Sequence, residues 1–213
     1  MSTTEQASPV TERGRRTMTK LVDAAAVVFA RKGFLDTKIT DITAEAGVAN
    51  GSFYTYFESK EVIFRAVIDE VNERMFTKSR VPAGAGSSPY QRIEHATRAY
   101  VRAYREEAGL LMILEQVASF SPAFREMRRE TRKSFRSRTE RGIRRFQEAG
   151  LVSPSLPPDY TAAALISMVS NFCYMWLVLD EDYDEETAIL TLSRLWAQAL
   201  GIEVEPRTAS SDS

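Results

Sequence analysis

The chain has 213 residues, of which 44% are hydrophobic and 27% are charged, so a well-packed globular protein is expected and a disordered or collagen-like chain is excluded. The 28 basic and 29 acidic residues give a formal net charge of -1, which excludes any partner that requires a strongly cationic protein overall. With one cysteine, Cys173, and one histidine, His95, neither a disulfide bond nor a Cys/His metal site is expected, and the predicted location is the cytoplasm.

Two segments bear on targeting and membranes. The polar residues 1–14 predict a flexible arm and not a signal peptide, because they contain no apolar stretch. Residues 160–179 carry no formal charge and are long enough to span a bilayer. Acids and prolines flank them without any Lys or Arg, however, so a helix buried on two sides is the preferred interpretation and no membrane partner is expected.

Hydrophobic residues recur at three- and four-residue spacing almost everywhere, which predicts an all-helical chain. The first helix contains Leu21 to Phe29 and ends near Gly33, and a later one begins after Ser59, a good N-cap. Residues 81–89 form a predicted linker, and the tail 202–213 is expected to be disordered. The other predicted helices are 39–46, 51–57, 90–107, 109–120, 122–149, 158–180 and 184–200.

The two short helices around Gly47 have the pattern of a helix-turn-helix motif. Gly47 permits the tight turn, and the predicted buried contacts come from Ile42, Ala46, Val48 and Phe53. The residues left to face outward carry amide, hydroxyl and ammonium groups, which suit base edges and phosphate oxygens: Asn50, Ser52, Tyr54, Thr55, Tyr56 and Lys60.

Residues 20–64 resemble the TetR family of transcriptional regulators. The resemblance rests on Ala25, Phe29, Ala30, Gly33-Phe34, Thr37, Ile39, Asp41-Ile42, Ala46-Gly47-Val48, Gly51-Ser52-Phe53-Tyr54, Tyr56-Phe57 and Ser59-Lys60-Glu61. It implies an all-α fold of nine helices, with an N-terminal three-helix helix-turn-helix module and a C-terminal bundle for ligand binding and dimerisation. The implied division is a flexible arm 1–14, a DNA-binding domain 15–60, a ligand-binding and dimerisation domain 61–201 and a tail 202–213.

The resemblance also implies which residues contact DNA: Thr40, Asn50, Gly51, Ser52, Tyr54, Thr55 and Tyr56, with Lys60 as a phosphate anchor. Lys38 and Ala49 stand where the family usually has Ser or Thr, so a capping hydroxyl is missing at each helix start. Lys38 is expected to contact a phosphate, and Asn50 either reads a base or caps its helix. Arg13, Arg15 and Arg16, placed before the first helix, either enter a minor groove or belong to a solvated arm.

Two partners besides DNA are implied. A homodimer through the last two helices would place two recognition helices on a near-palindromic operator. The apolar faces expected there are Leu165, Val169, Phe172 and Trp176; Ile166, Ser170, Cys173 and Leu177; and Leu192, Leu195, Trp196 and Ala199.

A small hydrophobic effector is expected in the C-terminal bundle. Its candidate contacts, each also interpretable as core, are Tyr100, Tyr104, Met112, Gln116, Phe120, Phe124, Met127, Phe135, Asn171, Met175 and Trp176. Residues 125–145 hold ten Lys or Arg and three Glu, whereas residues 180–186 hold six acids. This pattern indicates either a solvated helix balanced by an acidic turn or an acyl-coenzyme A-like ligand lying against Arg128, Arg132 or Arg136.

The expected function is therefore a ligand-responsive, sequence-specific DNA-binding repressor. The alternatives are a helical interaction protein without DNA binding and a small-molecule-binding enzyme. No Walker loop, nucleophile elbow or dinucleotide-binding turn is present, and the acids from Asp180 onward lack the Gly and Glu of a calcium loop. Consequently no catalytic residue, metal or cofactor is expected, and His95 is predicted to lie on a surface or a pocket edge.

Overall fold

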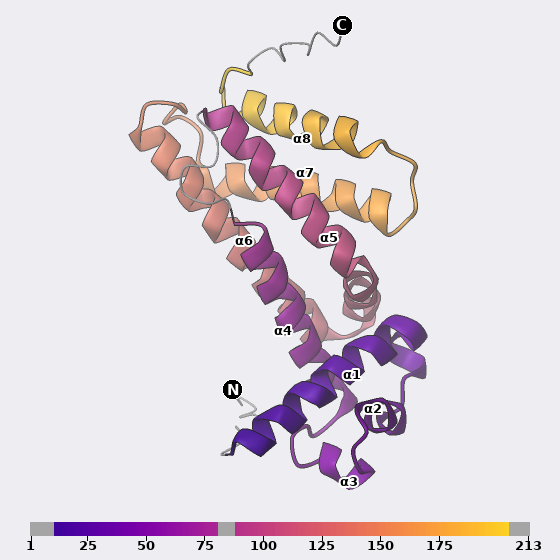
Figure 1. Ribbon diagram of the computed structural model, residues 1–213. Coiled ribbons are helices and arrows are strands. Elements are labelled where there is room, and N and C mark those ends of the chain that lie inside the picture. The colour runs from indigo at the N-terminus through magenta and orange to yellow at the C-terminus, as the bar shows by residue number, and fades with distance from the viewer. Residues whose placement is uncertain (1–10, 81–87, 205–213) are drawn as a thin grey trace, which may run out of the picture. The chain divides into compact units, whose positions relative to one another are not determined.

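A computed structural model describes residues 11–80 and 88–204, and the predictions for residues 1–10, 81–87 and 205–213 lie outside this part. Every regular element in it is an α-helix (Figure 1). The helices are α1 (Glu12–Asp36), α2 (Ile39–Ala46), α3 (Asn50–Phe53), α4 (Lys60–Lys78), α5 (Pro89–Phe120), α6 (Pro122–Glu148), α7 (Pro158–Leu177) and α8 (Glu185–Ala199).

The all-α fold class is confirmed, but the described residues form eight helices and not nine. The difference arises in α5, which runs without a break through Gly109, where a boundary between two helices was predicted. Glycine costs only about 1 kcal/mol inside a helix. The residues that follow Gly109 bury a continuous stripe, so packing overrides this local preference: Leu110, Ile113, Leu114 and Val117.

The chain divides into two compact units. One contains the chain up to Arg74 together with Gly109–Arg129, and the other contains Met75–Ala108 and the chain from Glu130 onward. Helices α4, α5 and α6 thus each contribute residues to both units.

In the first unit, α1 begins at Glu12, before the arginines that were predicted to precede it. The Thr11 hydroxyl accepts a hydrogen bond from the Gly14 amide at 3.1 Å and caps the helix. Arg13, Arg15 and Arg16 therefore lie inside α1, and the expectation that they precede it is wrong. The helix is interrupted at Gly33, where φ is 74°, which agrees with the predicted stop.

Four phenylalanine rings form the centre of this unit. Phe64 of α4 lies 4.9 Å from Phe29 and 5.1 Å from Phe34, measured between ring centroids. Phe124 of α6 lies 5.4 Å from Phe34 and 5.3 Å from Phe64. Edge-to-face ring pairs of this kind are worth about 0.5–1.5 kcal/mol each beyond the area that they bury.

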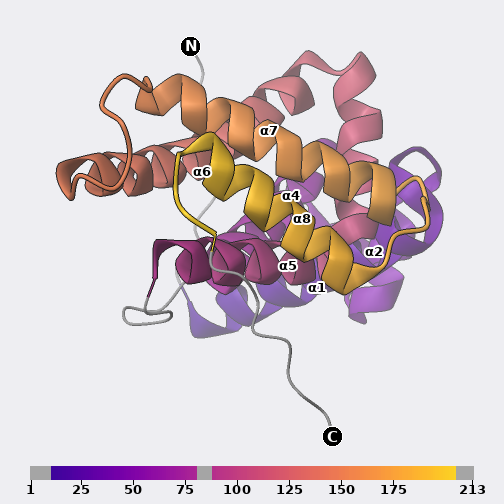
Figure 2. The ribbon, with the colours of Figure 1, turned by 90° about the horizontal axis from the view of Figure 1, so that it is seen from above.

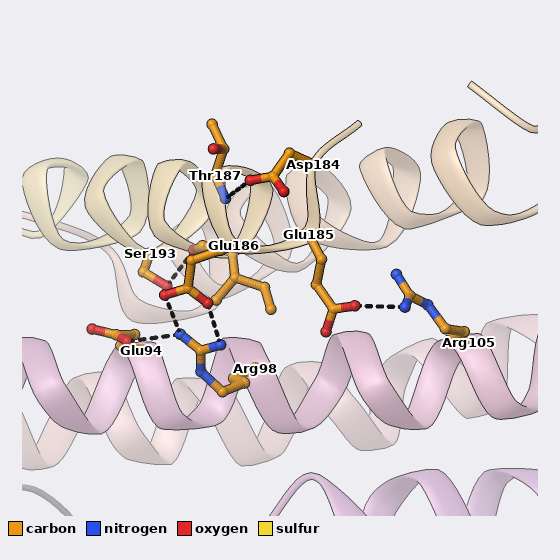
Figure 3. A network of polar contacts seen from close by, with 9 residues as sticks. Glu94, Arg98, Arg105, Asp184, Glu185, Glu186, Thr187 and Ser193 are labelled. Carbon is orange, nitrogen blue, oxygen red and sulfur yellow. Dashed lines mark hydrogen bonds and ion pairs between the residues drawn. The ribbon is translucent and has the colours of Figure 1, made fainter. Parts of the chain in front are cut away.

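In the second unit, α8 lies along α7 and across α5 (Figure 2). Their shared core is Tyr90, Ile93, Ile143, Val152, Ala162, Leu165, Ala197, Leu200 and Ile202. Two ion pairs hold the first turn of α8 on α5: Arg98 donates to Glu186 at 2.6 Å, and Arg105 donates to Glu185 at 2.5 Å (Figure 3). Two of the clustered acids thus pair with α5, not with the Arg-rich helix α6.

Within the single chain, the apolar helix α7 buries one stripe of residues. The buried members are Ala162, Leu165, Val169, Cys173 and Trp176. Phe172, Ile166, Ser170 and Leu177 stay partly exposed in the single chain, so each of the two predicted faces is mixed. None of the helices in the described part of the chain has the length and hydropathy that crossing a membrane requires.

Candidate functional site

The turn between α2 and α3 is closed by Gly47, whose φ of 66° places it in the left-handed region. The Gly47 amide donates to the Ala44 carbonyl at 3.2 Å, and the Val48 amide donates to the Thr43 carbonyl at 3.0 Å. Ile42 and Phe53 are fully buried, as predicted, and they fix the packing of α2 and α3. The helix-turn-helix geometry therefore follows from two apolar anchors and one glycine.

Helix α3 is shorter than the predicted segment 51–57. Only Asn50–Phe53 is helical, and the chain continues in turns: the Tyr56 and Phe57 amides both donate to the Phe53 carbonyl at 2.9 Å. Because Phe53 and Phe57 are buried, the side chains between and before them are turned outward.

The structure places most of the predicted DNA contacts on this outer surface. Tyr54 is 59% exposed. Thr40, Asn50, Gly51, Thr55 and Lys38 are exposed as well, whereas Ser52 and Tyr56 are half-buried. The surface offers hydroxyl and amide groups and one free-standing ammonium group, the kinds of group that contact base edges and phosphates.

Asn50 does not cap its own helix. Its side-chain oxygen accepts a hydrogen bond from the Thr43 hydroxyl at 3.4 Å, and the N-cap Ala49 supplies no side-chain bond. At the start of α2, where Lys38 stands in place of a capping Ser or Thr, the backbone amide of Lys38 donates to the Asp41 carboxylate at 3.0 Å. An ion pair with Lys32, together with this bond, holds the pKa of Asp41 below its usual value. The side chain of Lys38 provides no hydrogen bond to the cap, but its charge helps to lower the pKa of Asp41.

Lys60 has partners inside the protein. Its ammonium group donates to the carbonyl oxygens of Phe34, Leu35 and Thr37 at 2.7, 3.1 and 2.9 Å. It also lies 4.6 Å from the centre of the Phe34 ring. A lysine has three N–H donors, so these carbonyls use all of them. The geometry thus assigns Lys60 to the end of α1, and its role as a phosphate anchor stays a prediction without geometric support.

The two arginines predicted to contact DNA near the N-terminus are exposed on α1. Arg15 and Arg16 pair with Glu12 at 2.5 and 3.3 Å. Exposed pairs of this kind contribute little to stability, so both guanidinium groups remain exchangeable.

The second unit encloses a cavity of about 510 Å³. Of the predicted ligand contacts, Tyr100 and Phe135 line it, and burial raises the pKa of the Tyr100 phenol. Most of the wall was not predicted: Phe76, Ser79, Arg80, Arg92, Ile93, Ala96, Thr97, Arg138, Thr139, Arg141, Gly142, Ile143, Arg145, Phe146, Ile166, Val169, Trp196 and Leu200. Three of these wall residues, Ile166, Val169 and Trp196, were predicted as apolar faces of the dimer interface and not as ligand contacts.

The other predicted ligand contacts lie elsewhere. Tyr104 and Trp176 are buried in the second unit, Met175 is partly buried and Asn171 is exposed, but none lines the cavity. In the first unit, Phe124 and Met127 are core residues, and Met112, Gln116 and Phe120 are exposed. Helical spacing therefore did not separate cavity wall from core, and at Met112 and Phe120 it did not separate buried from exposed positions.

The three arginines proposed for an anionic ligand also lie outside the cavity wall. Arg128 pairs with Glu115 at 2.6 Å, Arg132 donates to the Ser167 hydroxyl at 2.9 Å, and Arg136 is exposed. Other charges of the same helix reach the cavity instead: Arg138, Arg141 and Arg145. Arg138 is two positions from Arg136, which turns it by about 200° around the helix axis.

Two family profiles match the chain. The profile described as "Bacterial regulatory proteins, tetR family" matches residues 21–67. The profile described as "Tetracyclin repressor-like, C-terminal domain" matches residues 86–180. The chain is 30% identical to the HTH-type transcriptional repressor KstR2 of Rhodococcus jostii over 54% of its own length and 61% of that protein, less than two thirds of the relative.

Two solved structures have the same fold. A transcriptional regulator from Rhodococcus sp. Rha1 has a TM-score of 0.71 at 21% identity, over 89% of this chain and 99% of that one. The regulator FadR from Bacillus subtilis, solved in complex with stearoyl-CoA, has a TM-score of 0.68 at 18% identity, over 85% of this chain and 98% of that one. Both profiles and the shared fold lead to one conclusion: the chain belongs to the TetR family of bacterial transcriptional regulators.

Proposed function

We propose that the protein is a homodimeric repressor that binds a near-palindromic DNA operator and leaves it when a small hydrophobic effector, such as an acyl-coenzyme A, occupies the second unit. The observation that carries the proposal is the exposed polar surface around α3, held out by the buried anchors Ile42 and Phe53, within the segment matched by the family profile. The relative KstR2 is described as a repressor, which supports the direction of regulation.

The proposed DNA contacts on this surface are Lys38, Thr40, Asn50, Gly51, Ser52, Tyr54, Thr55 and Tyr56, with Arg15 and Arg16 on α1. Asn50 lies on the exposed surface beside Thr43, and its amide group suits an adenine or a phosphate oxygen. Lys38 contributes charge that carries no sequence information.

Selection of bound duplexes from a random DNA library tests this proposal. We expect a palindromic consensus with half-sites about 34 Å apart or at a related helical spacing, and an affinity that falls steeply with salt. Tyr54→Ala is expected to weaken binding to the selected site by at least tenfold, because base and phosphate contacts are typically worth about 1–3 kcal/mol. The control Tyr160→Ala removes an even more exposed tyrosine (76%) and should leave affinity unchanged. Enrichment of no sequence would contradict the proposal.

The effector part of the proposal rests on the cavity in the second unit. Its volume of about 510 Å³ lies within the range of small-molecule sites, and most of its wall is apolar. The stearoyl-CoA complex of the FadR fold relative supports a ligand of this chemical type. Phe76 of α4 and Ser79, directly after this helix, line the cavity, while the start of α4 belongs to the core of the first unit. A hundredfold release from DNA requires a coupling of only about 2.7 kcal/mol.

A further inference from the structure

Five arginines line the cavity of the second unit, and no carboxylate does. They are Arg80, Arg92, Arg138, Arg141 and Arg145. Several arginines elsewhere in the described part of the chain pair with acids, such as Arg98 with Glu186 at 2.6 Å and Arg144, on the same helix as Arg138, with Glu140 at 2.8 Å. The cavity arginines form no such ion pair among the described residues, so their charge is left without an internal counter-ion.

Arg138 shows the cost of this arrangement most clearly. It is half-buried, and its guanidinium group donates to two neutral acceptors, the Phe76 carbonyl at 2.7 Å and the Ser79 hydroxyl at 2.6 Å. The group also stacks on the rings of Phe76 and Phe135, at 4.3 and 5.4 Å from their centres. Burial, followed by the nearby charges of Arg80 and Arg141, lowers the pKa of Arg138. A half-buried cation beside other cations is stabilised when an anion binds next to it.

The remainder of the wall is apolar and aromatic. Its rings come from four different helices, with Phe76 on α4, Tyr100 on α5, Phe135 and Phe146 on α6 and Trp196 on α8. Aliphatic side chains complete it: Ile93, Ile143, Ile166, Val169 and Leu200. A molecule with a hydrophobic body and a negative end would satisfy both parts of this surface, whereas a neutral hydrophobic molecule would leave the arginines unpaired.

A second, smaller cavity of about 310 Å³ adjoins the first on its charged side. The two share Arg92, Gly142, Arg145 and Phe146 in their walls. The second cavity, next to Arg92 and Arg145, therefore offers space for a head group larger than a carboxylate.

Resting on the proposed function, we infer that the effector is an amphipathic anion whose negative group is held by Arg138 together with Arg141, with its hydrophobic body against the aromatic wall. A guanidinium group binds carboxylates and phosphates through paired N–H donors, so both chemistries fit. A fatty acid carries the first and an acyl-coenzyme A the second.

Calorimetric titration of the DNA-free protein with dodecanoate, dodecanoyl-coenzyme A and the neutral 1-dodecanol tests the charge requirement. We expect at least one anion to bind ten or more times more tightly than the alcohol, with an affinity that falls as salt rises. Preference for dodecanoate identifies a carboxylate head, and preference for the thioester identifies a phosphate-bearing one. Binding of the alcohol as tightly as both anions, or no heat from either anion, would overturn the inference.

Variants on one helix then test the assignment. Arg138→Gln and Arg141→Gln should each weaken binding of the preferred anion by at least tenfold, while Arg144→Gln, which removes a paired arginine outside the cavity wall, should leave it unchanged. Arg141 is exposed, so its variant keeps the test valid even where loss of Arg138 impairs folding. Unchanged anion affinity in folded Arg141→Gln and Arg138→Gln overturns the assignment.

The two proposals fail separately. Anion binding that depends on Arg141 in a protein that selects no DNA would remove the repressor function and leave the effector class standing. If the protein selects an operator and is released from it by neutral compounds alone, the repressor function would stand and the anionic effector class would fall.

Discussion

The ammonium group of Lys60 caps the C-terminal end of α1 by donating to three carbonyl oxygens, at 2.7, 2.9 and 3.1 Å. These carbonyls belong to the last turn of a helix, where backbone acceptors lack intrahelical donors. A positive charge at this end also interacts favourably with the helix dipole. Lys60 therefore stabilises the fold of the candidate DNA-binding unit from within.

We expect Lys60→Met to lower the free energy of unfolding by about 1–2 kcal/mol, because three charge-assisted bonds are lost at a partly exposed position. Lys38→Met is the matched control: Lys38 is exposed and its side chain provides no hydrogen bond to the α2 cap, so the variant should lose much less stability than Lys60→Met while its DNA affinity falls. Urea denaturation measures both. A Lys60 variant with unaltered stability but weakened operator binding would restore the phosphate-anchor role.

The thiol of Cys173 is fully buried, and burial raises its pKa to about 12. The thiolate is the reactive form, so a raised pKa keeps the group protonated at pH 8 and slows its chemistry. We expect a thiol reagent such as dithionitrobenzoate to label the native protein at pH 8 at least a hundred times more slowly than the protein in concentrated guanidinium chloride. Rapid labelling of the native protein would show that α7 opens readily.

Residue roles were predictable where they depend on neighbours in sequence. The outward positions around α3 follow from the buried partners Ile42 and Phe53, only a few residues away. The role of Lys60 could not be predicted, because the carbonyl oxygens that its ammonium group contacts lie 23 to 26 residues earlier in the chain. The cavity arginines could not be predicted either, since the packing of α4, α5, α7 and α8 around α6 decides which charged residues of α6 face the cavity.

At the scale of elements, the helix-turn-helix depends on the backbone of Gly47. A side chain added at Gly47 would meet no atom within 4 Å, so only the φ of 66° opposes substitution there. We expect Gly47→Ala to destabilise the protein by about 1–2 kcal/mol, the cost of a left-handed conformation for an L-residue. Gly51 has equally open surroundings but no positive φ, so Gly51→Ala should be neutral or slightly stabilising. Equal melting temperatures for the two variants would contradict this account.

Helix boundaries were predicted well where a local cap exists and poorly where packing decides. Ser59 accepts a hydrogen bond from the Val62 amide at 3.3 Å, and Asp184 accepts one from the Thr187 amide at 2.9 Å, so α4 and α8 begin where the sequence indicates. Gly109 has the composition of a break, yet the stripe that α5 buries carries the helix through it. The cap at Thr11 was missed because the charged residues after it obscure a helix start.

At the scale of the whole molecule, the exposed side of α8 supports the proposed homodimer. Leu195 is 47% exposed in the single chain, and the residues around it on the same face are Thr191, Gln198 and Ala199. Partly exposed apolar residues of α7 outside the cavity wall, such as Phe172 and Leu177, add to the surface that a second copy would cover. Such a face is typical of a helical homodimer.

We expect Leu195→Glu to convert the dimer to a monomer, because a charge would be buried without a partner. The shift is measured by sedimentation or light scattering, and operator affinity should fall with it because half-site pairing is lost. Leu35→Glu, at a leucine that is 73% exposed, is the control and should remain dimeric. A dimeric Leu195 variant would move the interface elsewhere.

The position of Phe124 has a consequence for modularity. This ring comes from a helix more than forty residues beyond the segment 21–67, yet it completes the cluster of Phe34 and Phe64. A fragment that stops at residue 80 would expose these rings to water and would be expected to aggregate or to fold weakly. Fusing the N-terminal DNA-binding segment to an unrelated domain would thus require another residue that covers its aromatic cluster. The segment is therefore not an independently transferable module.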